Sequence, residues 1–169
     1  MNSKILLRNI FRFFFLVLLQ VLILNNIQFS KFINPYLYVL FILLMPFESP
    51  PWLVMIVSFL LGLSVDMFSH TIGMHTSACV LLAFLRPYVL KIFAPRDGYE
   101  SGTFPRISYY GFEWFLKYAV VLVFAHHLML FYIEVFRFSA FFSTLLRTFL
   151  STIFSVFIIM ISQYIVFRK

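Results

Sequence analysis

Six apolar runs divide the chain, and this pattern limits the possible folds more than any other feature of the sequence. They occupy residues 10–27, 32–47, 51–68, 74–93, 112–135 and 140–167. Runs such as 80–85 are continuously apolar, whereas strands of a membrane barrel alternate apolar and polar residues. All runs but the second have at least 18 residues, enough for a helix to cross a bilayer. The sequence therefore predicts an all-α integral membrane protein, a bundle of transmembrane helices.

Composition supports a membrane bundle and argues against several other classes of protein. Hydrophobic residues make up 63% of the 169 residues and charged residues 11%, against about 25% charged in soluble domains. We therefore expect residues 1–169 to form a single polytopic membrane domain. Cys79 is the one cysteine, which excludes an intrachain disulfide or a thiolate cluster. The net charge of +7 comes from residues that punctuate the apolar runs, which is untypical of nucleic-acid binding.

The second run decides the predicted topology. Its 16 residues would reach about 24 Å as a helix, against a hydrocarbon core of roughly 30 Å. If it spans and the N-terminus is cytoplasmic, ten basic residues lie inside, and Lys31, Arg137 and Arg147 lie outside. If it does not span, five lie inside and eight outside. Because lysine and arginine prefer the cytoplasmic side, we expect six spans with both termini in the cytoplasm.

Asp66 is an acidic residue inside an apolar stretch, where an embedded charge costs about 2.5 to 3.5 kcal/mol. Such a group usually faces a partner, a cavity or a helix end. Its spacing of four from His70 would allow an acid/base or metal pair on one helical face. The sequence Thr-Ile-Gly after His70 instead predicts that the helix ends there, which places Asp66 in the terminal turn.

Motifs of enzymatic chemistry are missing from the sequence. It contains no HExxH motif, no P-loop and no pattern indicating a Ser-His-Asp triad. His126 and His127 lie in the middle of the fifth run, and neighbouring positions on a helix point about 100° apart. We interpret the two as polar residues that hydrogen-bond across the bundle. The chain is therefore expected to have no catalytic residue, metal site or cofactor.

The one long hydrophilic connection covers residues 94–111 and is expected to face the cytoplasm. Its prolines and glycines argue against a continuous helix, and Asp97-Gly98 is a turn signal. The connection, which includes Arg96, is either a shaped contact surface or a solvated linker that serves orientation.

Other polar and aromatic residues lie near the predicted ends of the spans. Arg86, beside Pro87, could hold lipid head groups or a partner, although anchoring at the cytoplasmic interface is the simpler explanation. Glu134 and Arg137 could form an i, i+3 ion pair. The aromatic residues that fit an interfacial belt are Tyr36, Tyr38, Trp52, Tyr109, Tyr110 and Trp114.

Four segments carry a resemblance to a known family. Residues 62–69 read GLSVDMFS and residues 73–78 read GMHTSA, which is similar to the signature of the rod shape-determining protein MreD family. Residues 83–90 and 94–100 also resemble one lineage of that family. The resemblance implies a six-helix fold like the substrate-binding component of energy-coupling-factor transporters. It also implies an inner-membrane component of the bacterial elongation machinery, with MreC, MreB, RodA and the RodA transpeptidase partner as partners.

The expected function is thus a non-enzymatic scaffold that binds MreC and links it to peptidoglycan synthesis, with membrane lipids around it. Gly62 and Asp66 share a helical face, and Gly73 permits a sharp bend, so this region either receives a partner or packs within the monomer. The candidate residues are Gly62, Asp66, Gly73, His75, Ala78, Arg86, Pro87, Arg96, Asp97 and Gly98. The alternative is a carrier of a small molecule or lipid-linked precursor, suggested by Asp66, His75 and the histidine pair.

Overall fold

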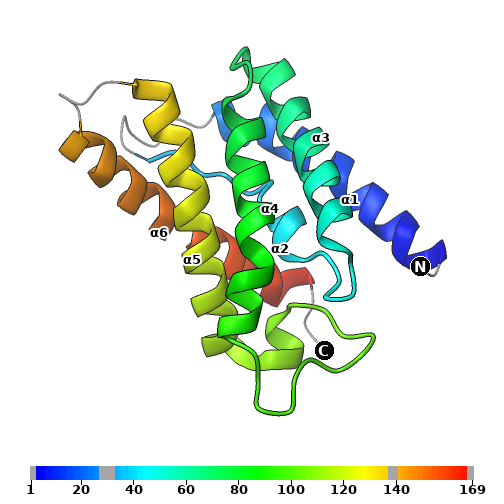
Figure 1. The fold of residues 1–169 in the computed structure, drawn as a ribbon. Helices are drawn as coiled ribbons and strands as arrows, with labels where there is room; N and C mark the ends of the chain where they lie inside the picture. Colours follow the sequence, from blue (N-terminus) through cyan, green and yellow to red (C-terminus); the bar gives the residue numbers. More distant parts are fainter. Residues whose placement is uncertain (1–2, 27–32, 137–140, 167–169) are drawn as a thin grey trace.

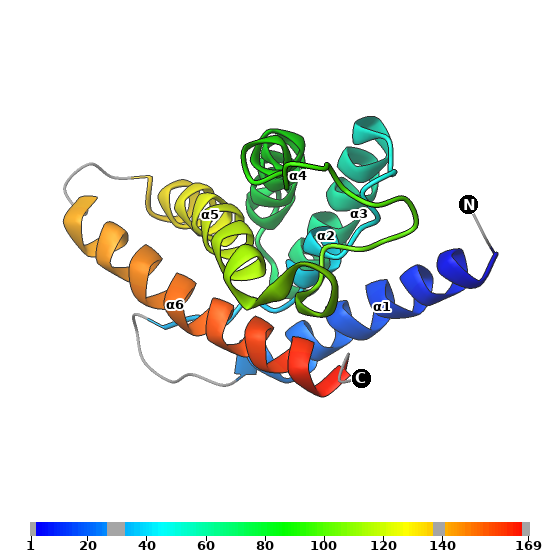
Figure 2. The same ribbon diagram turned by 90° about the horizontal axis from the view of Figure 1, so that it is seen from below.

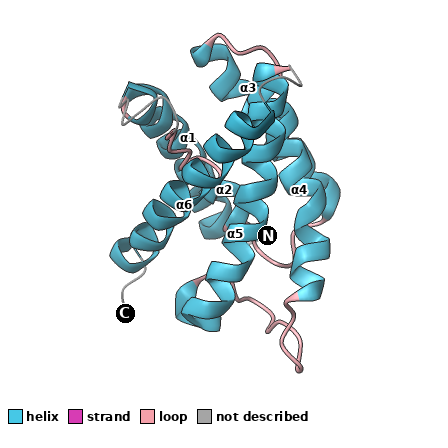
Figure 3. Ribbon diagram, turned by 90° about the vertical axis from the view of Figure 1, so that its left-hand side faces the viewer, coloured by secondary structure: helices cyan, strands magenta, loops and turns pink. Residues whose placement is uncertain are grey.

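The computed structural model describes residues 3–26, 33–136 and 141–166, and within them the protein is all-helical without a strand (Figure 3). The elements are α1 (Ser3–Leu22), the 3-10 turn η1 (Leu24–Asn26), α2 (Leu40–Leu43), α3 (Pro51–Ser69), α4 (Met74–Ile92), α5 (Ile107–Val135) and α6 (Phe141–Val166). This confirms the predicted all-α class.

The helices form two layers. Helices α3, α4 and α5 lie side by side in chain order (Figure 1), and α1 and α6 cross one side of this layer with α2 between (Figure 2). Helix α1 contacts α3, and α6 contacts α5. The hydrophobic core lies between the layers and includes Leu61, Leu82, Leu122 and Ile159, all with no exposed surface.

Four helical segments of the described chain are long and apolar enough to cross a membrane. They are Leu6–Asn26, Pro51–Ser69, Ile107–Val135 and Phe141–Val166. The protein is therefore a membrane protein. Helix α4 has 19 residues but is more polar, and the polar residues His75, Thr76 and Arg86 on it are buried against neighbouring elements.

The ends of the bundle are named here after two buried charged residues. At the Asp66 end, α3 ends, α4 begins, α5 ends and α6 begins. The end of α1 joins it there, because Asn25 Nδ2 donates to Ser69 Oγ at 3.0 Å. At the Arg86 end, α3 begins, α4 ends and α5 begins, and Gly102 N donates to Glu48 Oε1 at 3.0 Å across two connections.

The main departure from the predicted spans is the second apolar run. Residues 33–47, called here the threading segment, pass through the bundle interior from the Asp66 end to the Arg86 end, with only Leu40–Leu43 in an α-helix. Every residue from 37 to 45 is at most 8% exposed. The prediction of a helical span over 32–47 is wrong for the described residues. This run is apolar because the protein surrounds it on all sides, and not because it faces lipid as a helix.

Side chains of α1 and α6 supply the hydrogen bonds that the extended part of the threading segment lacks. The backbone N–H groups of Asn34 and Tyr36 donate to Ser151 Oγ at 3.1 Å and Ser155 Oγ at 3.0 Å. Residues i and i+2 of an extended chain are about 6.6 Å apart, close to the rise of about 6 Å between positions i and i+4 of a helix. The two serines of α6 therefore match alternate residues of the segment.

Gln20 of α1 serves the opposite edge of the same stretch. Its Nε2 donates to the Pro35 carbonyl at 2.9 Å, and its Oε1 accepts from Leu37 N at 2.9 Å. Irregular backbone at membrane depth requires internal partners of this kind, because lipid offers none. Three polar side chains thus allow a non-helical chain to pass through the bundle.

Candidate functional site

Asp66 joins the end of α3 to the start of α4. Its side chain is 2% exposed and accepts five hydrogen bonds. Oδ1 accepts from Thr71 Oγ1 at 2.9 Å and His75 N at 3.0 Å, and Oδ2 accepts from Gly73 N at 3.1 Å, Thr76 N at 3.0 Å and Thr76 Oγ1 at 2.6 Å. The carboxylate satisfies backbone N–H groups at the start of α4, where a negative charge is favoured.

Gly62 and Gly73 make this junction compact. A Cβ on Gly62 would lie 2.5 Å from Thr76 Cα, so α3 and α4 touch backbone to backbone. Gly73 precedes α4 with φ 83°, a left-handed conformation that favours glycine. Ala78 is fully buried against Leu130 and Phe131 of α5. These candidate residues therefore lie together and pack within the monomer.

A chain of buried aromatic and polar groups lies beneath the junction. The Tyr38 hydroxyl is 2.7 Å from His75 Nδ1 and 2.8 Å from His126 Nε2, so it donates to one ring and accepts from the other. His127 Nδ1 donates to the Val123 carbonyl at 2.6 Å. The predicted hydrogen bonding of the histidine pair across the bundle is confirmed. Tyr38 was expected in the interfacial belt, but it is fully buried.

His127 connects these buried aromatic and polar side chains to α6. In the neutral His127 ring, Nδ1 carries the proton and donates the hydrogen bond to the Val123 carbonyl. Nε2 therefore accepts a hydrogen bond from Ser155 Oγ at 3.2 Å. The Tyr36 ring packs against His75 and His127, with ring centres 5.3 Å away in both cases. The two histidines of α5 therefore face different partners, as their 100° separation predicts.

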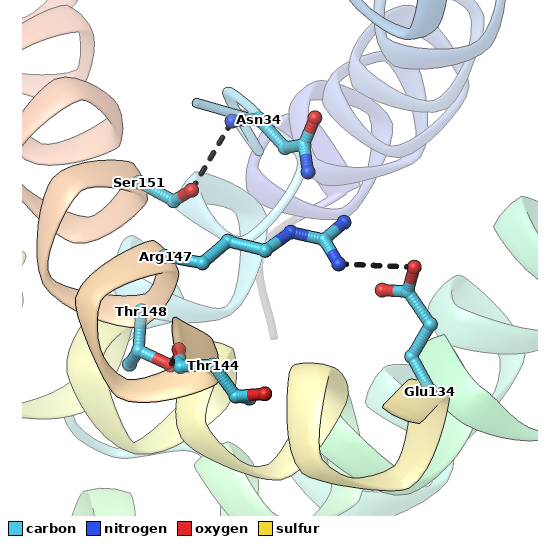
Figure 4. Close-up of polar contacts among 6 residues, drawn as sticks. All are labelled: Asn34, Glu134, Thr144, Arg147, Thr148 and Ser151. Carbon is cyan, nitrogen blue, oxygen red and sulfur yellow. Dashed lines mark hydrogen bonds and ion pairs between the residues drawn. The ribbon is translucent and has the colours of Figure 1, made fainter. Parts of the chain in front are cut away.

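A polar cleft of about 250 Å³ opens at the Asp66 end above these rings. Arg147 Nη1 donates to Glu134 Oε1 at 3.0 Å, and the Arg147 guanidinium lies 4.1 Å from the Phe131 ring centre. Figure 4 shows Arg147 reaching from α6 toward Glu134, with Asn34 beside it. Glu134 therefore pairs with Arg147, and the predicted partner Arg137 lies outside the described residues.

Arg86 holds the other end of the threading segment. It is 3% exposed; its Nη2 donates to the Met45 and Pro46 carbonyls, and its Nε donates to Tyr118 Oη at 3.1 Å. Tyr118 donates in turn to the Leu43 carbonyl at 3.0 Å. The Leu43 carbonyl lies at the end of α2, and the Met45 and Pro46 carbonyls follow it in the connection to α3. Interfacial anchoring of Arg86 is therefore wrong, because the guanidinium is buried among carbonyl groups. The neighbouring Pro87 is exposed.

The connection after α4 folds onto the bundle. Gly98 N donates to the Pro95 carbonyl at 3.0 Å with φ 77° at Gly98, which confirms the predicted turn. Tyr99 stacks on Phe47 with ring centres 4.2 Å apart and donates to the Leu90 carbonyl at 2.7 Å. Burial raises the pKa of Tyr99 to about 12, so it remains a donor. At its tip, Arg96, Asp97 and Gly98 are exposed.

Helix α5 is broken near its start, because Gly111 interrupts the helix with φ 83° and ψ 168°. The break separates residues 107–110, where Tyr110 packs against Tyr99 of the connection, from the long remaining part of α5.

A groove of about 840 Å³ runs between the lipid-facing sides of α5 and α6. Phe112 and Phe124 mark its extent on α5, and Phe149 and Tyr164 mark it on α6. At 1.5 Å per residue these pairs are about 18 and about 22 Å apart. The lining is almost entirely apolar. Thr152 contributes a buried hydroxyl that finds no hydrogen-bond partner among the described residues.

The described residues contain no group of three histidine, cysteine, aspartate or glutamate side chains that could hold a metal ion. Asp66 is buried, whereas His70 is exposed, so they do not form the metal or acid/base pair considered above. Sequence reasoning missed Gln20, Asn34, Arg147 and the serines of α6. A polar stripe on α6 was the available signal, formed by Thr144, Thr148, Ser151 and Ser155.

Comparisons with family models, with curated proteins and with solved structures find no match for this chain. The likeness to the MreD family and to the energy-coupling-factor component thus remains a prediction from the sequence motifs.

Proposed function

We propose that this protein is a non-enzymatic scaffold of a bacterial cell-elongation complex, similar to MreD, which binds a single-span protein such as MreC. The observation that carries the proposal is the apolar groove between α5 and α6, which can receive one side of a helix over about 18 to 22 Å of the roughly 30 Å hydrocarbon core. Through that partner the scaffold is linked to RodA, its transpeptidase partner and MreB.

The polar groups of the interior support a scaffold over a catalyst. Asp66, Arg86 and Gln20 use their hydrogen-bonding groups to hold backbone segments of the same chain. Such contacts fix the relative positions of α1, α3, α4 and the threading segment. A rigid frame of this kind can present α5 and α6 to a partner without any chemical step.

Substitutions that fill the groove test the partner site. We expect Val121→Trp and Ile153→Trp, at positions 42% and 66% exposed, to reduce copurification of MreC by about tenfold or more, because an indole occupies space needed by the partner helix. Ile56→Trp, on α3 and 52% exposed, is the matched control and should retain the partner.

Equal recovery of MreC with all three variants would contradict the groove as the binding site. A small molecule or lipid-linked precursor retained in the polar cleft, without a protein partner, would favour the alternative carrier function.

The proposal includes the orientation in the bacterial inner membrane, with the Arg86 end and both termini in the cytoplasm. Exposed basic residues gather at that end, and they include Arg8, Lys91, Arg96 and Lys117. We expect a reporter inserted at Gly98 to be active only in the cytoplasm and one at Ile72, 96% exposed at the Asp66 end, to be active only outside. The reverse pattern would overturn this orientation.

A further inference from the structure

A second groove, of about 320 Å³, lies at the Arg86 end between α1, the threading segment and the end of α6. On α1 its lining extends from Arg8 to Leu16, a rise of about 12 Å. Leu40 of the threading segment and Val166 of α6 complete the apolar wall. The groove thus reaches into the apolar region over a depth comparable with one leaflet of the hydrocarbon core, roughly 15 Å.

Two arginines stand at the mouth of this groove, and a third lies close by. Arg8 and Arg12 are one helical turn apart and both line the groove. The guanidinium carbons of Arg8 and Arg106 lie 4.8 and 4.6 Å from the centre of the same Phe104 ring. Arg8 and Arg106 therefore meet at Phe104, and Arg12 lies one helical turn further along α1.

The charges of this cluster favour an anion. The ion pairs found among the described residues are Lys117–Glu113 and Arg147–Glu134, and neither involves Arg8 or Arg12. Arg12 donates to the Leu44 carbonyl at 3.3 Å. Burial and the positive charge of Arg8 lower the pKa of Arg106 to about 10, so the group is still charged at neutral pH.

We propose that this groove binds an anionic phospholipid, with the phosphate between Arg8 and Arg12 and one acyl chain along Phe11, Phe15 and Leu40. Guanidinium groups make charge-assisted hydrogen bonds to phosphate oxygens. The apolar wall below them matches a hydrocarbon chain, so the site combines both parts of a phospholipid. The bound lipid would tie α1 to the threading segment and α6 at this end of the bundle.

Photolabelling of the full-length protein in nanodiscs tests this site. The probes are phosphatidylglycerol and phosphatidylcholine that carry a photoreactive group on the acyl chain, and the products are mapped by mass spectrometry. Both lipids carry the phosphate, but the choline cation of phosphatidylcholine is repelled by the arginines, whereas phosphatidylglycerol has a net negative charge. We therefore expect phosphatidylglycerol to label peptides containing Phe11, Phe15 or Leu40 about tenfold more than phosphatidylcholine.

Arginine variants separate a specific site from general attraction to basic protein. Arg8→Gln with Arg12→Gln should remove this preference, and Arg8→Gln alone, which changes an exposed side chain, should reduce it severalfold in a folded protein. The control Lys91→Gln with Lys117→Gln removes the same charge from exposed positions elsewhere. Equal labelling by the two lipids, or an equal loss in the control, would overturn the proposal.

Discussion

Asp66→Asn is expected to lower the free energy of unfolding by about 3 kcal/mol or more, the largest effect of a single conservative change in this protein. The carboxylate accepts five hydrogen bonds through two oxygens. An asparagine keeps one acceptor oxygen and turns an NH₂ group toward the remaining donors. Buried N–H groups at the start of α4 then lose their partner, each at a cost of roughly 1 to 3 kcal/mol.

Equilibrium unfolding in mixed micelles, followed by tryptophan fluorescence, measures this effect. Asp97→Asn is the matched control, because Asp97 is exposed in the turn after α4 and should change stability by less than about 0.5 kcal/mol. If Asp66→Asn proved as stable as the control but failed to bind MreC, the carboxylate would bind the partner and would not stabilise the junction of α3 and α4.

Arg86→Leu should destabilise the protein by about 2 to 4 kcal/mol and loosen the threading segment. The change leaves the Met45 carbonyl buried without its donor and removes one partner of the Tyr118 hydroxyl. Hydrogen exchange of the amides of residues 40–46, compared with those of α3, would report the local loosening. Arg86→Lys should recover part of the loss, since lysine keeps three donors without the planar fork.

Lys91→Leu provides the control for Arg86, because it removes a positive charge from an exposed position on the same helix. An anchoring role at the interface would make the two leucine variants equally harmful to membrane insertion. We expect a large loss of stability for Arg86 alone, with insertion unchanged for both.

Much of the α3–α4 region could be predicted from the sequence, because its signals are local. The glycine at 73 and the break after His70 place the ends of two helices within one or two residues of their positions in the structure. Asp97-Gly98 likewise specifies a turn whatever surrounds it. These features depend on the backbone preferences of adjacent residues, so they can be predicted from a short stretch of sequence.

The threading segment could not be predicted in the same way. An apolar run of 16 residues has the same composition whether it faces lipid as a helix or is buried on all sides as an extended chain. The decision depends on Gln20, Ser151 and Ser155, which lie more than 10 residues away and supply its hydrogen bonds. The roles of Arg86 and Tyr38 follow from this arrangement, so they were missed with it.

The most direct test of the scaffold account is photo-crosslinking in cells from single positions on the helices. A photoreactive amino acid at Val121 or Ile153 lies in the α5–α6 groove, and one at Ile56 lies on the exposed side of α3. The account predicts that the groove positions capture the transmembrane helix of a single-span protein such as MreC and that Ile56 does not. Capture of lipid alone from the groove positions, or of MreC from Ile56 alone, would contradict it.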